Sequence, residues 1–380
     1  MNSISAASFS DTKKHYEILD GLRGVAAVIV VMFHFLETFT DGSNLKQIIN
    51  HGYLAVDFFF VLSGFVIGYA YDDRWQKMTL KGFFKRRLIR LHPMIITGML
   101  IGAVAYYFQA SPAFPVINSV PVWKMLIILV IGFTLLPVPT SMDIRGWGEM
   151  HPLDGPAWSL FFEYIGNILY ALFIRKFSNK TLAILTFLAG CATIHLSVFG
   201  GQGDVIGGWS LEPKQIYIGF TRLLYPFLAG LLLSRVKKPT HIKNSFLWCS
   251  LLITLILFVP RIGGQEHLWI NGLYVSISII FFFPFIVYLG ASGEVTGKFS
   301  SKMCKFFGDI SYPIYIIHYP FIYIFYAYVS KNHVSLMDSI PVVIVIFIAC
   351  ITIAYASLKL YDLPIRKWLT RRFLTGTLNK

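Results

Sequence analysis

Long apolar blocks separated by short polar stretches run through the whole chain. Blocks such as residues 22–39, 54–71 and 340–360 contain about twenty residues, the length that a helix needs to cross the hydrocarbon of a bilayer. Eleven blocks are predicted to be helices, at residues 21–39, 53–71, 93–110, 122–138, 157–174, 182–199, 214–233, 244–260, 269–290, 310–329 and 338–360. The pattern therefore predicts an all-α, polytopic membrane helix bundle.

Basic residues collect between these blocks. The clusters are Lys13 with Lys14 and the stretches 74–90, 175–180, 235–243, 298–305 and 366–372. Lys and Arg near the ends of spans mark cytoplasmic loops, so all six clusters are expected in the cytoplasm. Between Arg90 and Arg175, however, there are three blocks, and three crossings would place the two basic clusters on opposite sides of the membrane. One of these three blocks therefore does not cross the membrane.

The block at 122–138 is the one predicted to return to its own side. It is short and begins beside Lys124, and prolines flank it at positions 115, 121, 137 and 139. Such re-entrant backbone is tolerated at membrane depth only where it is buried in protein or lines a cavity. We expect ten crossings, an extracytoplasmic segment at 111–156 that folds back toward the membrane, and both termini in the cytoplasm.

This pattern gives one domain over residues 1–380, with a cytoplasmic segment at 1–19 and a cytoplasmic tail at 365–380. The polar first nineteen residues carry no signal-peptide cleavage site, so the first block is expected to be a retained helix.

Composition supports the membrane assignment. Hydrophobic residues make up 56% of the chain and charged residues 14%, against roughly 25% charged in soluble domains. The basic residues behind the net charge of +14 lie between apolar blocks and not on one polar face. We therefore expect them to set the orientation of the helices in the membrane and to attract anionic lipid of the bilayer, and we expect no nucleic-acid binding. Four scattered cysteines without CxxC spacing predict neither a disulfide framework nor a zinc site.

Two ionisable residues in the first block are candidates for chemistry. Arg23 and His34 are eleven residues apart, which puts them on one helix face, about 16 Å apart along the axis. A guanidinium at the cytoplasmic mouth could hold an anionic donor, with the deeper imidazole acting as general base. Alternatively, Arg23 reaches lipid head groups and His34 bonds a neighbouring helix.

Two carboxylates could orient a histidine. Asp57 enters the second block from the outer side, and Glu37 lies near the outer end of the first. A carboxylate fixes the imidazole tautomer and raises its basicity, so either could form a dyad. Asp57 could equally be a helix cap.

The stretch KGFFKRRLIRLHP places Arg86, Arg87 and Arg90 at the membrane edge. Clustered guanidinium groups suit the phosphates of a nucleotide-like donor such as coenzyme A, although a plain topogenic loop would look the same.

The stretch PLDGPAWSLFFEYIGN carries Ser159 and Glu163 four residues apart, on one helix face. Glu163 is expected to take a hydrogen-bonding or acid–base role near the outer half of the membrane, because a carboxylate inside a span is costly. Trp158 could be an interfacial anchor.

A late block begins FGDISYPIYIIHYP. Ser311 and His318 are seven residues apart and share a face, with Tyr312 beside them. Glycine-rich phosphate loops, HExxH zinc motifs and GxSxG elbows are absent from the sequence, and no metal site is predicted.

Taken in order, these motifs resemble the bacterial integral-membrane acyltransferase-3 family, of the O-antigen acetylase type, over nearly the whole chain. The family pattern of an arginine, ten residues and a histidine corresponds to Arg23 and His34. Its FFxLSGF motif corresponds to residues 59–65, which include Ser63. Its RRxxRxxP motif corresponds to Arg86, Arg87, Arg90 and Pro93. WSLxxE corresponds to Trp158, Ser159, Leu160 and Glu163, and GxxSYxxYxxH to Gly308, Ser311, Tyr312, Tyr315 and His318. The closing ExP motif of the family is not matched: the chain reads Tyr361, Asp362, Leu363 and Pro364, so an aspartate stands two positions before the proline, where the family has glutamate.

The resemblance implies transfer of an acyl group, commonly acetyl, from cytoplasmic acyl-CoA to a hydroxyl of an extracytoplasmic or lipid-linked glycan. Acyl-CoA would be a co-substrate, no bound cofactor is expected, and the location would be the bacterial cytoplasmic (inner) membrane. Arg23 and the arginine cluster would bind the donor, and His34 would be a base or a transient acyl carrier. Glu163 and His318 would assist or line the acceptor path.

Two other functions are compatible with polar residues in spans. A secondary transporter would be built from inverted repeats, and the halves of this sequence show no similarity to each other. In a scaffold protein, polar groups would only hold helices together, so that replacing His34 would reduce stability and not activity alone.

Overall fold

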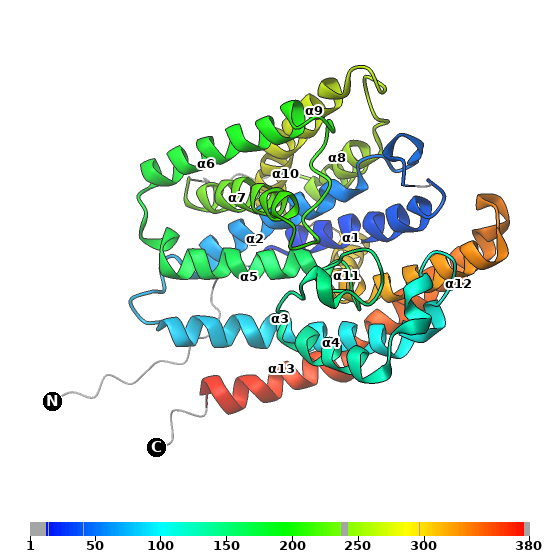
Figure 1. Cartoon of the computed structure of the whole chain (residues 1–380). Helices are drawn as coiled ribbons and strands as arrows, with labels where there is room; N and C mark the ends of the chain where they lie inside the picture. Colours follow the sequence, from blue (N-terminus) through cyan, green and yellow to red (C-terminus); the bar gives the residue numbers. More distant parts are fainter. Residues whose placement is uncertain (1–12, 14, 41, 237–241, 296, 376–380) are drawn as a thin grey trace.

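The computed structural model describes residues 13, 15–40, 42–236, 242–295 and 297–375, and within them every regular element is helical (Figure 1). The α-helices are α1 Glu17–Glu37, α2 Ala55–Tyr71, α3 Leu80–Ala105, α4 Val122–Thr134, α5 Ala157–Leu172, α6 Asn179–Ile194, α7 Pro213–Val236, α8 Ser245–Phe258, α9 Leu268–Ile277, α10 Phe283–Ala291, α11 Lys298–Asn332, α12 Leu336–Ser357 and α13 Leu363–Thr370. The predicted all-α helix bundle is confirmed.

Eight helical stretches of the described chain are long and apolar enough to cross a membrane. The other two predicted crossings correspond to α8, which has only 14 residues, and to α11, which has 35 residues whose tyrosines, prolines and histidine lower its mean hydropathy, so ten crossings stay a prediction. The eleventh predicted block corresponds to α4, which has only 13 residues and is about 20 Å long. That length is too short for the roughly 30 Å of hydrocarbon.

Contacts with α3 show that α4 is re-entrant. The Tyr107 hydroxyl, just beyond the outer end of α3, donates to Val120 O, whereas Phe133 O near the end of α4 bonds His92, midway along α3. The chain then returns outward, because the Tyr106 hydroxyl donates to Ile144 O. The segment therefore enters the bundle and leaves it on the same side, as predicted from its prolines and the neighbouring charges.

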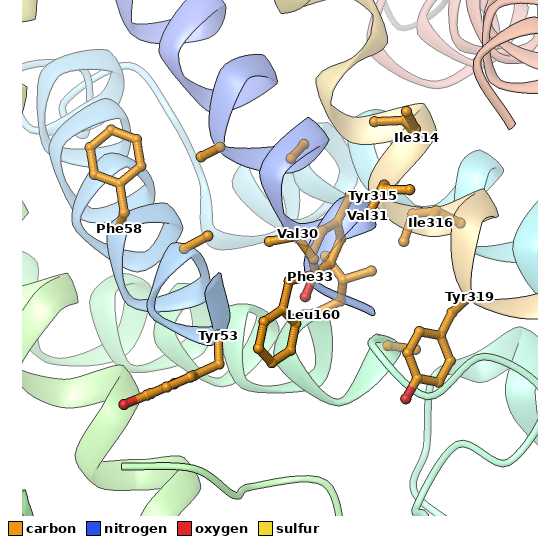
Figure 2. Close-up of a cluster of buried hydrophobic side chains, with 14 of the residues drawn as sticks. Val30, Val31, Phe33, Tyr53, Phe58, Leu160, Ile314, Tyr315, Ile316 and Tyr319 are labelled. Atoms are coloured by element: carbon orange, nitrogen blue, oxygen red, sulfur yellow. The ribbon is translucent and has the colours of Figure 1, made fainter. Parts of the chain in front are cut away.

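Small residues allow the central helices to pack closely. A Cβ on Gly24 of α1 would lie 2.0 Å from Phe307 O of α11, and a Cβ on Gly64 of α2 would lie 2.0 Å from Phe227 O of α7. Such close approach is typical of helix pairs in membranes, where packing replaces the hydrophobic effect. Figure 2 shows α1 passing between α2 and α11, with buried side chains from all three helices and from α5, including Val30, Phe33, Phe58, Leu160, Ile314 and Tyr315.

The predicted tail at 365–380 continues the last span. A π-turn at Leu358–Asp362 connects α12 to α13, and a second at Arg371–Thr375 follows it. The Lys85 ammonium of α3 donates to Phe373 O, so this part is packed against the bundle. Residues 376–380 of the tail, and residues 1–12 and Lys14 of the expected N-terminal segment, lie outside the described residues.

Candidate functional site

A cavity of about 480 Å³ lies among α1, α2, α3, α5, α11 and the junction of α12 with α13. Its polar lining residues are His15, Glu17, Asp20, Arg23, Ser63, Arg87, Arg90, Ser159, Glu163, Lys305, Asp309, Ser311, Tyr312, Tyr315, Asp362 and Arg366. Most of the residues singled out in the sequence therefore line one cavity, although they come from helices far apart in the chain.

Charged side chains of both signs line the cavity. Arg23 bonds Asp20 at 3.0 Å and Arg366 bonds Asp362 at 3.0 Å, so these two guanidinium groups are neutralised locally. Within the described part of the chain, Arg90 and Lys305 form no ion pair, and Arg90 is exposed to the cavity. These two cations are available for an anionic group of a ligand.

Arg86 does not belong to this cavity wall, unlike its neighbour Arg87. At 100° per residue the three arginines lie within about 100° of arc on α3, but only Arg87 and Arg90 line the cavity. That all three arginines bind the donor stays a prediction.

Glu163 joins three helices at the cavity wall. Its Oε1 accepts hydrogen bonds from Ser63 Oγ of α2 at 3.0 Å and from Arg87 Nη2 of α3 at 2.9 Å. The sequence placed Glu163 near the outer half of the membrane, but this contact puts it at the level of the basic run. The reason is that α5 begins below the outer surface: Asp154, just before it, packs against Gly98, about 10 Å inside the outer end of α3.

The cavity ends at Ser159 and Tyr315. Ser159 Oγ donates to Pro156 O at 2.9 Å and lies 2.7 Å from the Tyr315 hydroxyl, which therefore donates to it. Phe59 packs edge-on against the Tyr315 ring with centroids 5.4 Å apart. Nearer the mouth, the Tyr312 hydroxyl donates to Leu91 O and Ser311 to Gly308 O.

His34 lies beyond that end and does not line the cavity. Its Nδ1 is 2.8 Å from Oε2 of Glu37, and the two side chains are 18% and 35% exposed. Because the carboxylate accepts, Nδ1 carries a proton, and Nε2 is the ring nitrogen left to act on a ligand. Arg23 and His34 were expected to share one internal pathway, but the Ser159–Tyr315 contact lies between the cavity and the histidine.

His318 stacks on His34 with ring centroids 5.5 Å apart. Its Nδ1 donates to the carbonyls of Ile314 and Tyr315, at 3.1 and 2.8 Å, and its Nε2 is buried without a partner in the described chain. Two imidazoles thus stack beyond the cavity, each with its Nδ1 held by an oxygen acceptor. Ser311 and His318 were expected on one face; Ser311 lines the cavity, and His318 lies deeper.

Asp57 is not the partner of a histidine. Its carboxylate forms a bidentate pair with Arg222 of α7, at 2.7 and 3.2 Å, and both side chains are almost fully buried. Arg222 also donates to Tyr53 O and lies under the Trp158 ring. Trp158 is therefore a packing partner of this ion pair and not an interfacial anchor, and Glu37 is the carboxylate that orients His34.

Sequence reasoning missed Arg222 and the charged residues of the outer segment. The rule that an ionisable residue within a span is functional or paired applied to Arg222 as well. Arg145 and Glu149 could not be found in this way, because they lie between the predicted helices, in the segment at 111–156. Both are buried, and the Tyr323 hydroxyl donates to Glu149 at 2.6 Å.

Burial changes the titration of this outer segment. It raises the pKa of Glu149 to about 7, with Arg145 opposing the rise, and it lowers the pKa of His151 to about 4. Burial, together with the neighbouring Glu149, raises the pKa of Asp154 well above its usual value. Both carboxylate oxygens of Asp154 have no partner among the described residues, which fits a protonated acid.

No group of three His, Cys, Asp or Glu side chains converges as metal ligands in the part of the chain that the structure describes. The groups that could contact a ligand are therefore the cations of the cavity and the two imidazoles.

Comparisons with known proteins agree with the motifs. A family model described as an acyltransferase domain matches residues 16–359. "Protein 2 in picA locus" of Rhizobium radiobacter is 33% identical over 185 residues, which cover 46% of this chain and 92% of that protein. "O-acetyltransferase OatA" of Staphylococcus aureus is 25% identical over 376 residues, which cover 92% of this chain and 57% of that protein. No solved structure matches the chain significantly.

Proposed function

The chain belongs to the acyltransferase-3 family of membrane proteins, and from this premise we propose that it transfers an acyl group such as acetyl from cytoplasmic acyl-CoA to a glycan hydroxyl. The acceptor would be an extracytoplasmic or lipid-linked glycan. The protein would lie in the bacterial inner membrane with both termini in the cytoplasm. A relative named O-acetyltransferase supports the reaction type.

One observation carries this proposal: a cavity that holds two cations without ion-pair partners among the described residues, Arg90 and Lys305, ends one side chain short of a histidine–carboxylate pair. Arg90 and Lys305 at the mouth offer charge-assisted contacts to the phosphates of coenzyme A. Arg23 and His34 are about 16 Å apart along α1, a span suited to the long pantetheine arm. Glu163 would hold Arg87 in place, with Ser63 fixing the carboxylate.

The donor side and the acceptor side would meet at Tyr315. The Ser159–Tyr315 hydrogen bond must open for the thioester carbonyl to approach the imidazoles. His34 would then take the proton of the acceptor hydroxyl on Nε2, because Glu37 holds Nδ1 as the donor. The hydroxyl oxygen bonds the carbonyl carbon, the carbon–sulfur bond breaks, and the thiolate takes up the proton as coenzyme A leaves.

In the alternative that the motif leaves open, His34 carries the acyl group. Nε2 attacks the thioester, coenzyme A leaves, and the acceptor hydroxyl takes the acyl group from the imidazole. The two routes differ in one observable, because only the carrier route leaves label on the protein when acceptor is withheld.

The proposal is tested with radiolabelled acetyl-CoA and membranes that contain the host's envelope glycans. Wild type and His34→Ala are compared at equal membrane abundance, with His195→Ala as a matched control at an exposed histidine outside the site. We expect glycan labelling by wild type and His195→Ala, and at least about 100-fold less by His34→Ala. Equal labelling by all three variants would exclude His34, and no labelling by wild type would exclude acetyl-CoA as donor.

A further inference from the structure

Trp147 is an exposed tryptophan held in a rigid loop. It is 38% exposed, between the buried residues Arg145 and Glu149. The Asp143 carboxylate accepts hydrogen bonds from three backbone N–H groups of the loop, those of residues 145, 146 and 148, at 2.8 to 2.9 Å. The glycines on either side of Trp147 have φ of +93° and +67°, values that favour glycine. The backbone at Trp147 is thus fixed before any ligand binds.

Buried side chains fix the same loop to α11. The Arg145 guanidinium is fully buried, donates to Pro152 O at 2.8 and 3.0 Å and to Gln109 at 2.8 Å, and lies 3.4 Å from the centre of the Tyr323 ring. Glu149 accepts the 2.6 Å hydrogen bond from the Tyr323 hydroxyl. Burying two charged groups in a loop is costly, and here they orient one exposed indole.

The indole is connected to the His34–Glu37 pair through Tyr326. Its ring is 5.5 Å from that of Tyr326, packed edge-on. The Tyr326 hydroxyl bonds the Thr38 side chain and is near the Glu37 carboxylate. Tyr319, two turns away on α11, packs edge-on against the His34 ring at 4.8 Å. Aromatic rings and the partly exposed carboxylate of Glu37 therefore lie around the imidazole.

This combination matches the chemistry of a sugar. Pyranose rings have an apolar face of C–H groups that packs on an aromatic ring, and hydroxyls at the rim that donate to carboxylates. We infer that Trp147 and Tyr326 form the acceptor subsite, where one sugar ring of the glycan stacks and presents its hydroxyl to His34. This inference rests on the proposed function and adds the residues that bind the acceptor.

A tryptophan at the membrane interface can also be a lipid anchor. Anchors of that kind need only exposure, as at Trp269 in the first turn of α9, which is 51% exposed. Trp147 differs in its fixed loop and in its contact with Tyr326, which adjoins the His34–Glu37 pair. These two features favour a ligand over lipid as the partner of the indole.

The test uses the polysaccharide fraction of the host envelope as acceptor, at graded concentrations, with labelled acetyl-CoA. Trp147→Ala is expected to raise the KM for polysaccharide at least about tenfold, the effect of roughly 1.4 kcal/mol of lost stacking. The KM for acetyl-CoA should stay within twofold of wild type. Trp147→Phe should restore most of the affinity, and Trp269→Ala should match wild type in both constants.

Each outcome has one reading. An unchanged KM for polysaccharide in Trp147→Ala, at wild-type membrane abundance, would overturn the acceptor subsite while the proposed function stands. Equal losses in Trp147→Ala and Trp269→Ala would identify a lipid anchor. If Trp147→Ala is not found in the membrane, the KM for polysaccharide and the KM for acetyl-CoA are measured in Trp147→Phe and Tyr326→Leu instead. A rise in the KM for polysaccharide alone, in Tyr326→Leu, supports the subsite, and its absence overturns it. No transfer by the wild type would contradict the proposed function itself.

Discussion

Glu163 of α5 and Arg87 of α3 form an ion pair of 2.9 Å at the wall of the cavity, and the same carboxylate oxygen also accepts a hydrogen bond from Ser63. The guanidinium is almost completely buried, with a side chain 6% exposed. A buried cation of this kind depends on its partner. The pair therefore shapes the donor cavity and stabilises the bundle.

Removing the carboxylate should lower stability as well as activity. Glu163→Ala leaves Arg87 buried and unpaired, and we expect a loss of about 2 kcal/mol, below the usual value for a fully buried pair because Glu163 is 20% exposed. Thermal unfolding of the purified protein in detergent measures this loss. The double variant Arg87→Gln with Glu163→Gln should be more stable than Glu163→Ala; an additive loss would contradict the coupling.

Glu37 should act on rate and not on folding. Glu37→Gln keeps a similar shape but cannot hold the Nδ1 proton of His34 as a carboxylate does, so kcat should fall by about 100-fold. Unfolding should stay near the wild-type temperature, since Glu37 is 35% exposed. A steady-state comparison of kcat, with the melting temperature as control, distinguishes this dyad from a merely structural contact.

The Asp57–Arg222 pair should behave in the opposite way. Asp57→Ala leaves a guanidinium that is 2% exposed without its counter-charge, and a loss of about 3–5 kcal/mol is expected. Membrane abundance measured by immunoblot should fall sharply. Normal abundance with lost activity would show that Asp57 takes part in chemistry, contrary to its position.

Arg90 should contribute to donor affinity. Loss of one charge-assisted contact to phosphate is expected to raise the KM for acetyl-CoA about 10-fold or more in Arg90→Ala, with a smaller effect at high salt. Arg86→Ala, at a residue that does not line the cavity, should have a clearly smaller effect. Equal effects of the two substitutions would indicate general attraction to the basic run and not a contact in the cavity.

Glu149 should make stability depend on pH. Its pKa is about 7 in the folded protein and 4.5 in a free side chain, so between these values the folded state binds the extra proton. The contribution of Glu149 to the free energy of unfolding is therefore present at low pH and is lost as pH rises through about 7. The loss is on the order of 2 kcal/mol. His151 acts with the opposite sign, because its folded pKa is lowered to about 4.

The contribution of Glu149 is isolated by a difference. The melting temperature of wild type minus that of Glu149→Gln should fall as pH rises from 5 to 8. A difference that does not change with pH would show that Glu149 has an ordinary pKa in the folded protein.

The sequence predicted those features that depend on local pattern. Twenty-residue apolar blocks defined the helices, and the balance of basic clusters identified the re-entrant α4. Helical spacing correctly put Ser159 and Glu163 on one wall of the cavity. These properties follow from the 3.6-residue period and from the cost of burying backbone and charge in lipid.

Features that depend on the tertiary fold were beyond the sequence. The partner of Asp57 is 165 positions away, and only packing of α2 on α7 selects Arg222. Arg145 and Glu149 belong to the segment at 111–156, between the predicted helices, and the helices around it bury them. The depth of Glu163 was misjudged because the outer segment occupies part of the bundle and shifts the start of α5 inward.

The hydrogen bond between Ser159 and Tyr315 lies between the cavity and the two histidines. In the proposed reaction the donor and the acceptor reach the protein from opposite faces of the bilayer, and a continuous aqueous passage between them would let protons flow down their gradient. Closing the path with one tyrosine would allow the transfer without a proton leak.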